Sequence, residues 1–213
     1  MRVQVPDRGR RPDTALRLGI FGGTFNPPHV AHLLCASEAR WQLRLARVLL
    51  VPTGVPPHKE MPQEPGIEHR LEMCKLAAAG HEDWLEVSDI EARREGPSYT
   101  VDTLAAINAS RPGDELTFIV GGDMAWSLPT WREPERILEL ARVAVAERAG
   151  ARREEIRERL AGLRGSGKID YIEVPRMDVS SAALRQRVRA GRPITYLVPE
   201  AVDEYIRERR LYT

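Results

Sequence analysis

The chain has 213 residues, of which 42% are hydrophobic and 30% charged, a composition that indicates a globular protein and excludes a fibrous or largely disordered one. Because 32 basic and 31 acidic residues nearly cancel, the overall charge gives no reason to expect nucleic acid or an acidic membrane as a partner. No apolar run approaches the ~20 residues that a membrane-spanning helix needs.

Residues 1–16 are basic and lack the apolar centre that a signal peptide has. We expect them to form a flexible extension, followed by a single domain over residues 17–213. The two cysteines, Cys35 and Cys74, fall in apparent helices among apolar neighbours, without metal-type spacing. We interpret them as reduced packing residues, which fits a cytoplasmic location.

Short β-rich runs alternate with amphipathic helical patterns along most of the chain. Several of the strand runs are continuously apolar, as expected for strands buried on both faces of a parallel sheet. The alternation therefore predicts an α/β fold with a doubly wound, mostly parallel sheet. The predicted strands cover residues 18–21, 48–52, 85–90, 116–121, 143–146 and 171–174, and the predicted helices begin near Pro28, Ile67, Thr100, Glu133 and Arg152.

Two segments depart from this alternation. Residues 51–66 are rich in proline and glycine, so we expect a long loop at the carboxyl end of the second strand, where open α/β sheets bind ligands. Residues 180–190 and 199–210 carry helical patterns with no strand between them. These patterns predict a small helical cap over residues 179–213.

The stretch GIFGGTFNPPHVAHL, residues 19–33, joins the first predicted strand to a helix. Gly22 and Gly23 end the strand, and residues without a side chain let backbone N–H groups approach a ligand closely. Pro27 and Pro28 suit the first turn of a helix, whose unpaired N–H groups and positive dipole end attract anions. This combination predicts a phosphate site.

Two histidines lie in the same stretch. His29 and His32 are spaced to share one face of the first helical turn, where imidazoles beside a phosphoryl group can stabilise developing negative charge. A helix cap or a surface position is the alternative for either histidine. Zinc is disfavoured because the HExxH spacing is absent and no third ligand suggests itself. The stretch also lacks the G-x-G-x-x-G fingerprint, and the chain has no G-x-x-x-x-G-K-[ST] loop.

The residues from Gly22 to His32 resemble the signature of the nucleotidyltransferase superfamily, G-G-[ST]-F-[DN]-P-x-H-x-x-H, with Ala31 where that superfamily more often has glycine. Four further motifs follow in order over nearly the whole chain: PPHK, GPSYTVDTL, GGDMAWSLPTW and YLVPEAVDEYI. Together they resemble the bacterial nicotinate-nucleotide adenylyltransferases. The resemblance implies a Rossmann-like nucleotidyltransferase fold.

The resemblance also implies a reaction between two small molecules, ATP and nicotinate mononucleotide. The 5′-phosphate of the mononucleotide attacks the α-phosphorus of ATP, usually with Mg²⁺ and without metal ligands from protein side chains, to give deamido-NAD and pyrophosphate. No protein nucleophile is needed, so catalysis rests on positioning and charge neutralisation. The expected catalytic residues are His29, His32, Lys59 and Arg185, with a solvated surface position as the alternative for Lys59.

The same resemblance implies a set of residues that bind ATP. Ser180 and Ser181 lie in the segment DVSSAALR, which resembles the family pattern [IV]-S-S-T-x-[IL]-R, with Ala182 in place of threonine. The two serines either cap a helix or contact phosphate. Asp123 either accepts a ribose hydroxyl or caps a loop. The full expected set is Gly22, Gly23, Thr24, Phe25, His32, Asp123, Ser180, Ser181 and Arg185.

A second set is expected to bind the mononucleotide. Trp131 is a candidate for stacking on the pyridine ring, with a core position as the alternative. Ser98, Tyr99 and Thr100 are expected to lie at the mouth of the site and to receive the nicotinate carboxylate, but Thr100 equally suits a helix N-cap. The full expected set is Asn26, Lys59, Ser98, Tyr99, Thr100 and Trp131.

Other functions stay open at this point. The departures at Ala31 and Ala182 leave room for a nucleotide-binding protein without turnover, and nicotinamide mononucleotide or phosphopantetheine is the alternative acceptor for an enzyme. The arginines of residues 147–165 are interleaved with acidic residues, which favours a solvated helix with ion pairs over nucleic-acid binding. Because symmetric assemblies are common, we also expect a homo-oligomer.

Overall fold

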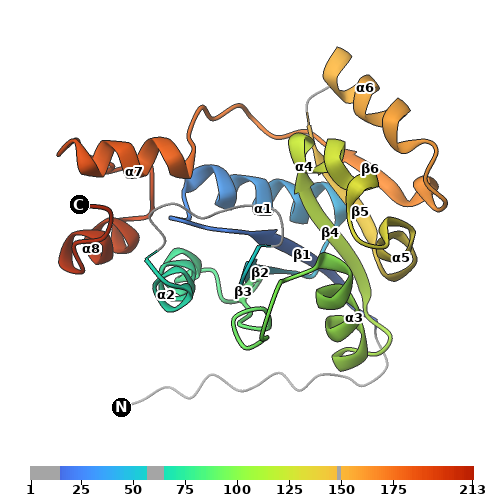
Figure 1. The fold of residues 1–213 in the computed structure, drawn as a ribbon, viewed down its shortest axis with the longest axis horizontal. Helices are drawn as coiled ribbons and strands as arrows, with labels where there is room; N and C mark the ends of the chain where they lie inside the picture. Colours follow the sequence, from blue (N-terminus) through green and yellow to red (C-terminus); the bar gives the residue numbers. More distant parts are fainter. Residues whose placement is uncertain (1–14, 57–64, 148–149) are drawn as a thin grey trace.

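The computed structural model of the chain, which describes residues 15–56, 65–147 and 150–213, contains one sheet of six parallel strands (Figure 1). The strand order is β3-β2-β1-β4-β5-β6. The predicted α/β fold with a doubly wound sheet is therefore confirmed. Most of the predicted N-terminal extension, residues 1–14, lies outside the described residues. The strands are β1 (Arg17–Gly23), β2 (Arg47–Pro52), β3 (Leu85–Val87), β4 (Glu115–Gly121), β5 (Arg142–Ala146) and β6 (Ile169–Ile172).

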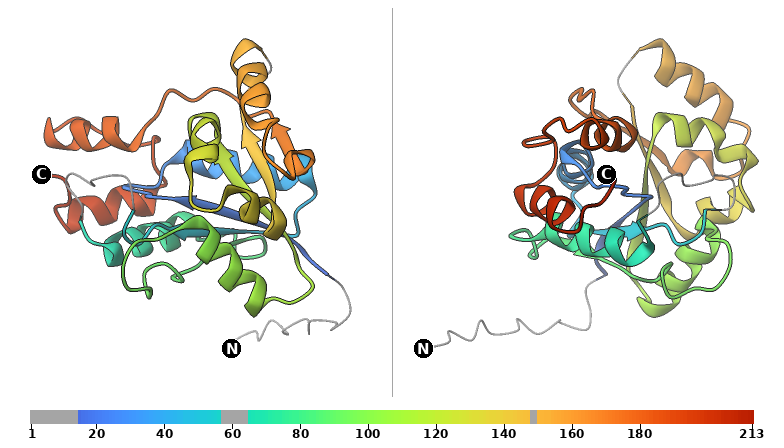
Figure 2. Two further views of the ribbon diagram at one scale, coloured as in Figure 1. Left: turned by 45° about the vertical axis from the view of Figure 1, so that its right-hand side comes forward. Right: turned by 60° about the vertical axis from the view of Figure 1, so that its left-hand side comes forward.

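Helices cover both faces of the sheet (Figure 1 and Figure 2). They are α1 (Val30–Leu43), α2 (Ile67–Ala78), α3 (Thr100–Ser110), α4 (Gly122–Ser127), α5 (Pro134–Leu140) and α6 (Ala151–Leu160), with 3₁₀ turns at Leu128–Thr130 and Ser166–Lys168. Strand side chains alternate in direction: Leu18 and Ile20 are buried on the face of α3 to α6, and Phe21 on the face of α1 and α2. This two-sided burial explains the continuously apolar strand patterns.

The order of the strands places the switch point of the sheet between β1 and β4. Helices α1 and α2 follow β1 and β2 on one face, whereas α4 and α6 follow β4 and β5 on the other face. Because β1 and β4 are neighbours, the helices change sides between them. Open α/β sheets bind ligands at such a switch point, outside the carboxyl ends of the strands.

Two further helices lie beside α2 at the end of the sheet where β1 ends (Figure 2). They are α7 (Ser181–Arg189) and α8 (Glu200–Glu208), and no strand separates them, as the sequence patterns predicted. Their apolar faces pack on α2 in a separate cluster that includes Met73, Leu184, Val202 and Ile206. No helix in the described part of the chain is long and apolar enough to cross a bilayer.

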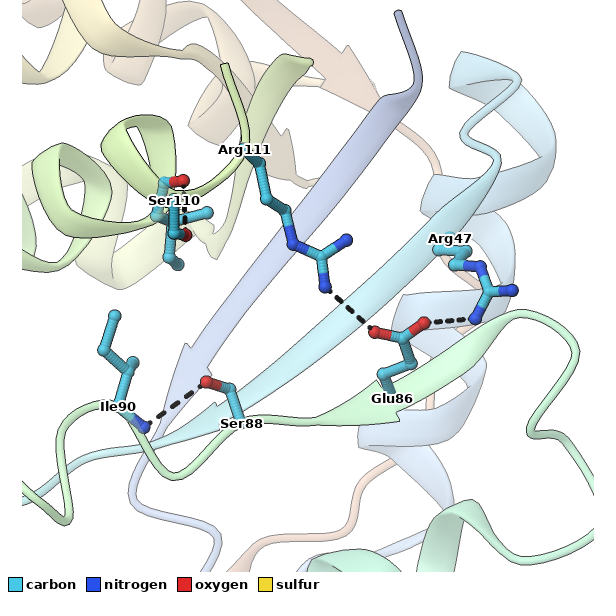
Figure 3. A network of polar contacts seen from close by, with 7 residues as sticks. Arg47, Glu86, Ser88, Ile90, Ser110 and Arg111 are labelled. Atoms are coloured by element: carbon cyan, nitrogen blue, oxygen red, sulfur yellow. Dashed lines mark hydrogen bonds and ion pairs between the residues drawn. The ribbon is translucent and has the colours of Figure 1, made fainter. Parts of the chain in front are cut away.

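Strand β3 is shorter than predicted, because a turn follows it directly. The hydroxyl of Ser88 accepts the N–H of Ile90 at 3.3 Å, and Figure 3 shows this turn beside the side chain of Glu86. Glu86 forms ion pairs with Arg47 on β2 and with Arg111, 3.3 Å away, after α3. These pairs hold a strand of 3 residues at the edge of the sheet.

The arginine-rich segment forms α6 and the turn after it. Arg157 pairs with Glu154 at 2.9 Å within the helix, as predicted. Arg152 and Arg159, however, lie over the ring of Trp126, at 5.1 and 4.7 Å from its centroid. Helix α6 is thus attached to α4 by cation–π contacts and is not merely solvated.

Both cysteines are unpaired and buried, which confirms the interpretation of Cys35 and Cys74 as packing residues. Burial raises the pKa of the Cys35 thiol to about 12. It also raises the pKa of the Cys74 thiol, although the nearby Arg70 opposes this shift. Thiols that stay protonated are poor nucleophiles and poor metal ligands.

Candidate active site

The chain leaves β1 through a tight loop at the switch point. Phe25 has a φ of 48° and is 1% exposed, with its ring packed against the ring of His32. A Cβ at Gly23 would lie 3.1 Å from the Phe25 ring, so this glycine makes room for that ring; its approach to a ligand stays a prediction. Among the described residues, the N–H groups of Thr24 and Phe25 donate no backbone hydrogen bond outside the regular elements.

Helix α1 begins at Val30, later than predicted, with His29 as its N-cap. The two prolines therefore precede the helix and do not form its first turn. The N–H of His29 donates to Nδ1 of His32, and the N–H of Val30 donates to the carbonyl oxygen of Leu197, both at 3.1 Å. These two N–H groups therefore already have acceptors within the protein, and the predicted phosphate site at this helix start stays a prediction.

The two predicted histidines stack on each other at the start of α1. Their ring centroids lie 3.7 Å apart, with 24° between the ring planes. His29 is 5% exposed, and its Nδ1 is buried without a hydrogen-bond partner within the described chain. Because Nδ1 of His32 accepts a backbone N–H, the neutral His32 ring carries its proton on Nε2.

Burial keeps both imidazoles neutral near pH 7. It lowers the pKa of His29 from 6.5 to about 4. Burial, together with the neighbouring His29, lowers the pKa of His32 to about 3. Neutral imidazoles still donate hydrogen bonds, and an anion placed beside them favours their protonation.

Lowering the pH is expected to destabilise the fold through these two histidines. The unfolded chain binds protons at the ordinary histidine pKa of 6.5, whereas folded His29 resists protonation down to about pH 4. Unfolding therefore takes up protons below pH 6.5, and the free energy of unfolding decreases as the pH falls. Urea titrations at pH 7 and pH 5 would measure this loss.

The variants His29→Gln/His32→Gln and His81→Gln make this test specific. The double variant should lose less stability than the wild type between the two pH values. The single variant changes an exposed histidine and should lose as much as the wild type. An equal loss in all three proteins would contradict the prediction.

The C-terminal helical cap, residues 179–213, contacts the loop between β1 and α1 directly. Arg185 donates from Nη1 to the carbonyl oxygen of Asn26 at 2.8 Å, and Ser181 donates to that of Pro27 at 2.9 Å. The Nε of Arg185 is buried and has no hydrogen-bond partner in the part of the chain described. Ser180 accepts a backbone N–H of the first turn of α7 at 3.2 Å. Ser180 is therefore the helix cap, whereas Ser181 holds the loop.

Two residues that the sequence patterns missed support the same loop. Arg70 on α2 is 1% exposed and donates to the carbonyl oxygens of Thr24 at 3.0 Å and Gly54 at 3.3 Å. Tyr212 donates its hydroxyl to the side-chain oxygen of Asn26 at 2.5 Å. Neither residue is near the loop in the sequence, so no local pattern could have identified it.

The segment 98–100 packs against the loop after β2. Ser98 is 6% exposed, and its N–H donates to the carbonyl oxygen of Val55 at 2.7 Å. A Cβ at Gly54 would lie 2.8 Å from the Ser98 hydroxyl, which is buried without a partner among the described residues. Tyr99 is the N-cap of α3, so the N-cap alternative for Thr100 is wrong.

Trp131 and Asp123 lie on the side of β4. Trp131 is partly buried, with its indole N–H donating to the hydroxyl of Ser127 at 2.9 Å and its ring 6.1 Å from that of Phe118. The ring thus belongs in part to the core, while the rest of it is accessible. Asp123 lies in the first turn of α4, a helix of 6 residues that is too short for a periodic pattern. It is exposed and pairs with Arg152 at 2.9 Å.

A cavity of about 370 Å³ lies beyond the carboxyl ends of β5 and β6. Its lining combines apolar side chains with charged ones and was absent from the sequence predictions. The lining residues are Ala146, Glu147, Val174, Arg176 and Met177.

Lys59 lies outside the described residues, so its role stays a prediction. Within residues 15–56, 65–147 and 150–213, no group of three or more histidine, cysteine or acidic side chains is placed to hold a metal ion.

This chain is similar to known proteins over most of its length. A cytidylyltransferase-like family model matches residues 20–187. A probable nicotinate-nucleotide adenylyltransferase of Moorella thermoacetica is 44% identical over 200 residues, which cover 92% of this chain and 91% of that relative. Another, of Geobacillus thermodenitrificans, is 41% identical over 196 residues, which cover 92% of this chain and 86% of that relative. The chain belongs to the nicotinate-nucleotide adenylyltransferase family.

The fold agrees with this family. The chain matches the solved structure of Plasmodium falciparum nicotinic acid mononucleotide adenylyltransferase complexed with NaAD, with a TM-score of 0.75. The match covers 92% of this chain and 97% of that chain. At 18% identity, this match concerns the fold alone. The predicted Rossmann-like nucleotidyltransferase fold is confirmed.

In the structure of this chain, the predicted site residues that are described follow the carboxyl edge of the sheet in strand order. His29 and His32 lie just after β1, next to the loop whose Asn26 carbonyl oxygen accepts a hydrogen bond from Arg185. Asp123 follows β4, and the cavity follows β5 and β6. The segment 98–100 lies on the other side, against the loop after β2.

Proposed function

We propose that the chain transfers the adenylyl group of ATP to nicotinate mononucleotide in NAD biosynthesis, forming deamido-NAD and pyrophosphate. The observation that carries this proposal is the stacked pair of His29 and His32 after β1, following a loop that Arg185 reaches at the carbonyl oxygen of Asn26. Hydrogen-bond donors and a permanent cation suit a polyphosphate substrate. Family membership, with relatives at 41% and 44% identity, supports the choice of the acceptor.

In the proposed reaction, an oxygen of the 5′-phosphate of nicotinate mononucleotide attacks the α-phosphorus of ATP. A phosphorus–oxygen bond forms as the bond from the α-phosphorus to the bridging oxygen breaks, and pyrophosphate leaves with that electron pair. The protein holds the two phosphates in line and donates hydrogen bonds where negative charge develops.

The geometry gives His32 and Arg185 different tasks. His32 donates from Nε2, because its Nδ1 is occupied by the N–H of His29. The incoming triphosphate raises the pKa of both imidazoles, which bind it as neutral hydrogen-bond donors. Arg185 supplies a planar fork of cationic donors from α7.

The two substrates fit on opposite sides of β1 along the carboxyl edge of the sheet. We assign the adenine base to the cavity beside β5 and β6, the ribose to Asp123 and the triphosphate to the histidines. This order of strands matches the order of the groups in ATP. The mononucleotide then lies towards the loop after β2, within reach of the segment 98–100, with Lys59 in the predicted role of a phosphate contact.

Magnesium would enter this site with ATP. The described residues offer imidazole, guanidinium and amide groups, and no acidic cluster that could hold the ion. Phosphate oxygens and water are therefore the ligands that we expect for Mg²⁺, which would neutralise part of the triphosphate charge. A homo-oligomer and a cytoplasmic location stay predictions.

The proposed function is tested by pyrophosphate release from ATP and Mg²⁺ with nicotinate mononucleotide, nicotinamide mononucleotide or phosphopantetheine as acceptor. We expect release to be fastest with the nicotinate compound. Faster release with another acceptor would show that this other compound is the substrate and that the proposed acceptor is wrong. ATP binding without release would favour the nucleotide-binding alternative that the departures at Ala31 and Ala182 left open.

Trp131→Ala is expected to raise the KM for nicotinate mononucleotide about tenfold and to leave the KM for ATP unchanged. The reason is the loss of a stacking surface for the pyridine ring, since stacking on an indole contributes about 1–3 kcal/mol. Steady-state kinetics measure both constants. Trp41→Ala is the matched control, because Trp41 is 81% exposed on α1, and it should behave as the wild type. An unchanged KM in Trp131→Ala would show that the ring is structural.

A further inference from the structure

Tyr212, which follows α8, is buried beside the active-site loop. Its side chain is 8% exposed and packs in the cluster that joins α2, α7 and α8. Its hydroxyl donates to Oδ1 of Asn26 at 2.5 Å, and Asn26 is itself 4% exposed. A hydrogen bond shielded from water in this way strongly restrains both of its ends.

Asn26 is held from two directions by the cap. Its carbonyl oxygen accepts from Arg185 at 2.8 Å, and its side-chain oxygen accepts from Tyr212. With Oδ1 occupied, the orientation of the amide is set, and Nδ2 is the side-chain group that remains for a ligand. The cap therefore fixes both the backbone and the side chain at this position.

A displacement of Asn26 would reach the histidine pair. The chain runs from Asn26 through Pro27 and Pro28 to His29, and each proline ring fixes its own φ angle. This short link is stiff, so it passes a shift of Asn26 on to His29 and to the stacked ring of His32.

We propose that Tyr212 is a positioning residue of the active site. Its hydroxyl holds Asn26 and, through the two prolines, sets the place of His29 and His32 relative to the transferring phosphate. Tyr212 does not touch the reacting atoms itself. This role rests on the proposed adenylyl transfer.

The test compares two variants that each remove one tyrosine hydroxyl from the cap and keep the ring. Tyr212→Phe should lower kcat for pyrophosphate release about tenfold, with both KM values within about threefold of wild type, because misplaced groups weaken mainly the transition state. Tyr205→Phe is the matched control, since the hydroxyl of Tyr205 on α8 bonds to His69 at 2.8 Å, away from the loop. It should keep the wild-type kcat.

A double-mutant cycle separates positioning from packing. If Tyr212 acts through Asn26, the variant Tyr212→Phe/Asn26→Ala should have the same kcat as Asn26→Ala alone. A purely structural tyrosine would instead lower the melting temperature and leave the kcat of the folded protein unchanged. Wild-type kcat in Tyr212→Phe, or full multiplication of the two effects in the double variant, overturns the proposal.

The remaining outcomes are also decisive. If Tyr212→Phe fails to fold, Asn26→Ala breaks the same hydrogen bond from the other side. A lowered kcat in Asn26→Ala supports the proposal, and wild-type kcat in that variant overturns it. If the wild type and Tyr205→Phe release no pyrophosphate, the proposed function is wrong and the positioning role falls with it. If only the positioning role is wrong, the wild type releases pyrophosphate and Tyr212→Phe is equally active.

Discussion

Replacing His32 by alanine is expected to lower kcat/KM by about 100-fold or more, which corresponds to about 2.7 kcal/mol of transition-state stabilisation. Binding of ATP should stay largely intact, because a neutral imidazole contributes most where charge develops in the transition state. Steady-state pyrophosphate release gives kcat/KM, and calorimetric titration with ATP gives the affinity. Near-normal turnover would contradict the assigned role of His32.

His32→Gln separates the chemistry from helix capping. His32 is at the third position of α1 and accepts the N–H of the N-cap residue His29, a place where glutamine also caps helices. Glutamine therefore restores the hydrogen bond to the N-cap residue without the imidazole. We expect this variant to be as slow as His32→Ala. Wild-type turnover in His32→Gln would show that capping is the whole function of the residue. The exposed His81, changed to glutamine, serves as the control.

Replacing Arg185 by methionine is expected to lower kcat/KM for ATP by about 100-fold, mainly through a higher KM for ATP. Charge-assisted hydrogen bonds to phosphate contribute about 1.5–3 kcal/mol each, and methionine cannot replace them. Nη1 of Arg185 already holds the carbonyl oxygen of Asn26, so the variant also loosens the loop between β1 and α1. Kinetics with varied ATP measure the effect.

Two further variants on α7 define the contribution of Arg185. Arg185→Lys keeps the charge without the planar fork and should recover only part of the lost activity. Arg189→Met removes an exposed arginine from the same helix and should match the wild type. An unchanged KM for ATP in Arg185→Met would place the guanidinium outside the substrate site.

The order of strands and helices could be predicted from the sequence because it depends on local periodicity. Apolar runs such as residues 116–120 are buried on both faces of the parallel sheet. The helices at Ile67 and Thr100 begin where their patterns begin. Local patterns failed where an element was short. Helix α4 has 6 residues, less than two full turns, and β3 ends at a side-chain turn.

The histidine pair could be predicted for a similar reason. His29 and His32 lie in one contiguous stretch, so their spacing alone brings the rings to the same side of the helix start. Their depressed pKa values could not be predicted, since burial depends on Phe25 and on the cap that covers the loop. The hydrogen bond from the N–H of Val30 to the carbonyl oxygen of Leu197 could not be predicted either, because the two residues are far apart in the sequence.

The sequence by itself thus determined the fold class, the family and the local arrangement of the phosphate loop, all of which depend on neighbours in the chain. Only the tertiary structure decided that Arg70 and Tyr212 hold this loop. It also decided that Ser180 caps α7, whereas Ser181 binds the loop. The cavity after β5 and β6 is a third feature of this kind. Hydrophobic periodicity indicates which side chains are buried but not which distant groups they meet. Those partners follow from the packing of α7 and α8 on α2, which brings residues 26 and 212 together.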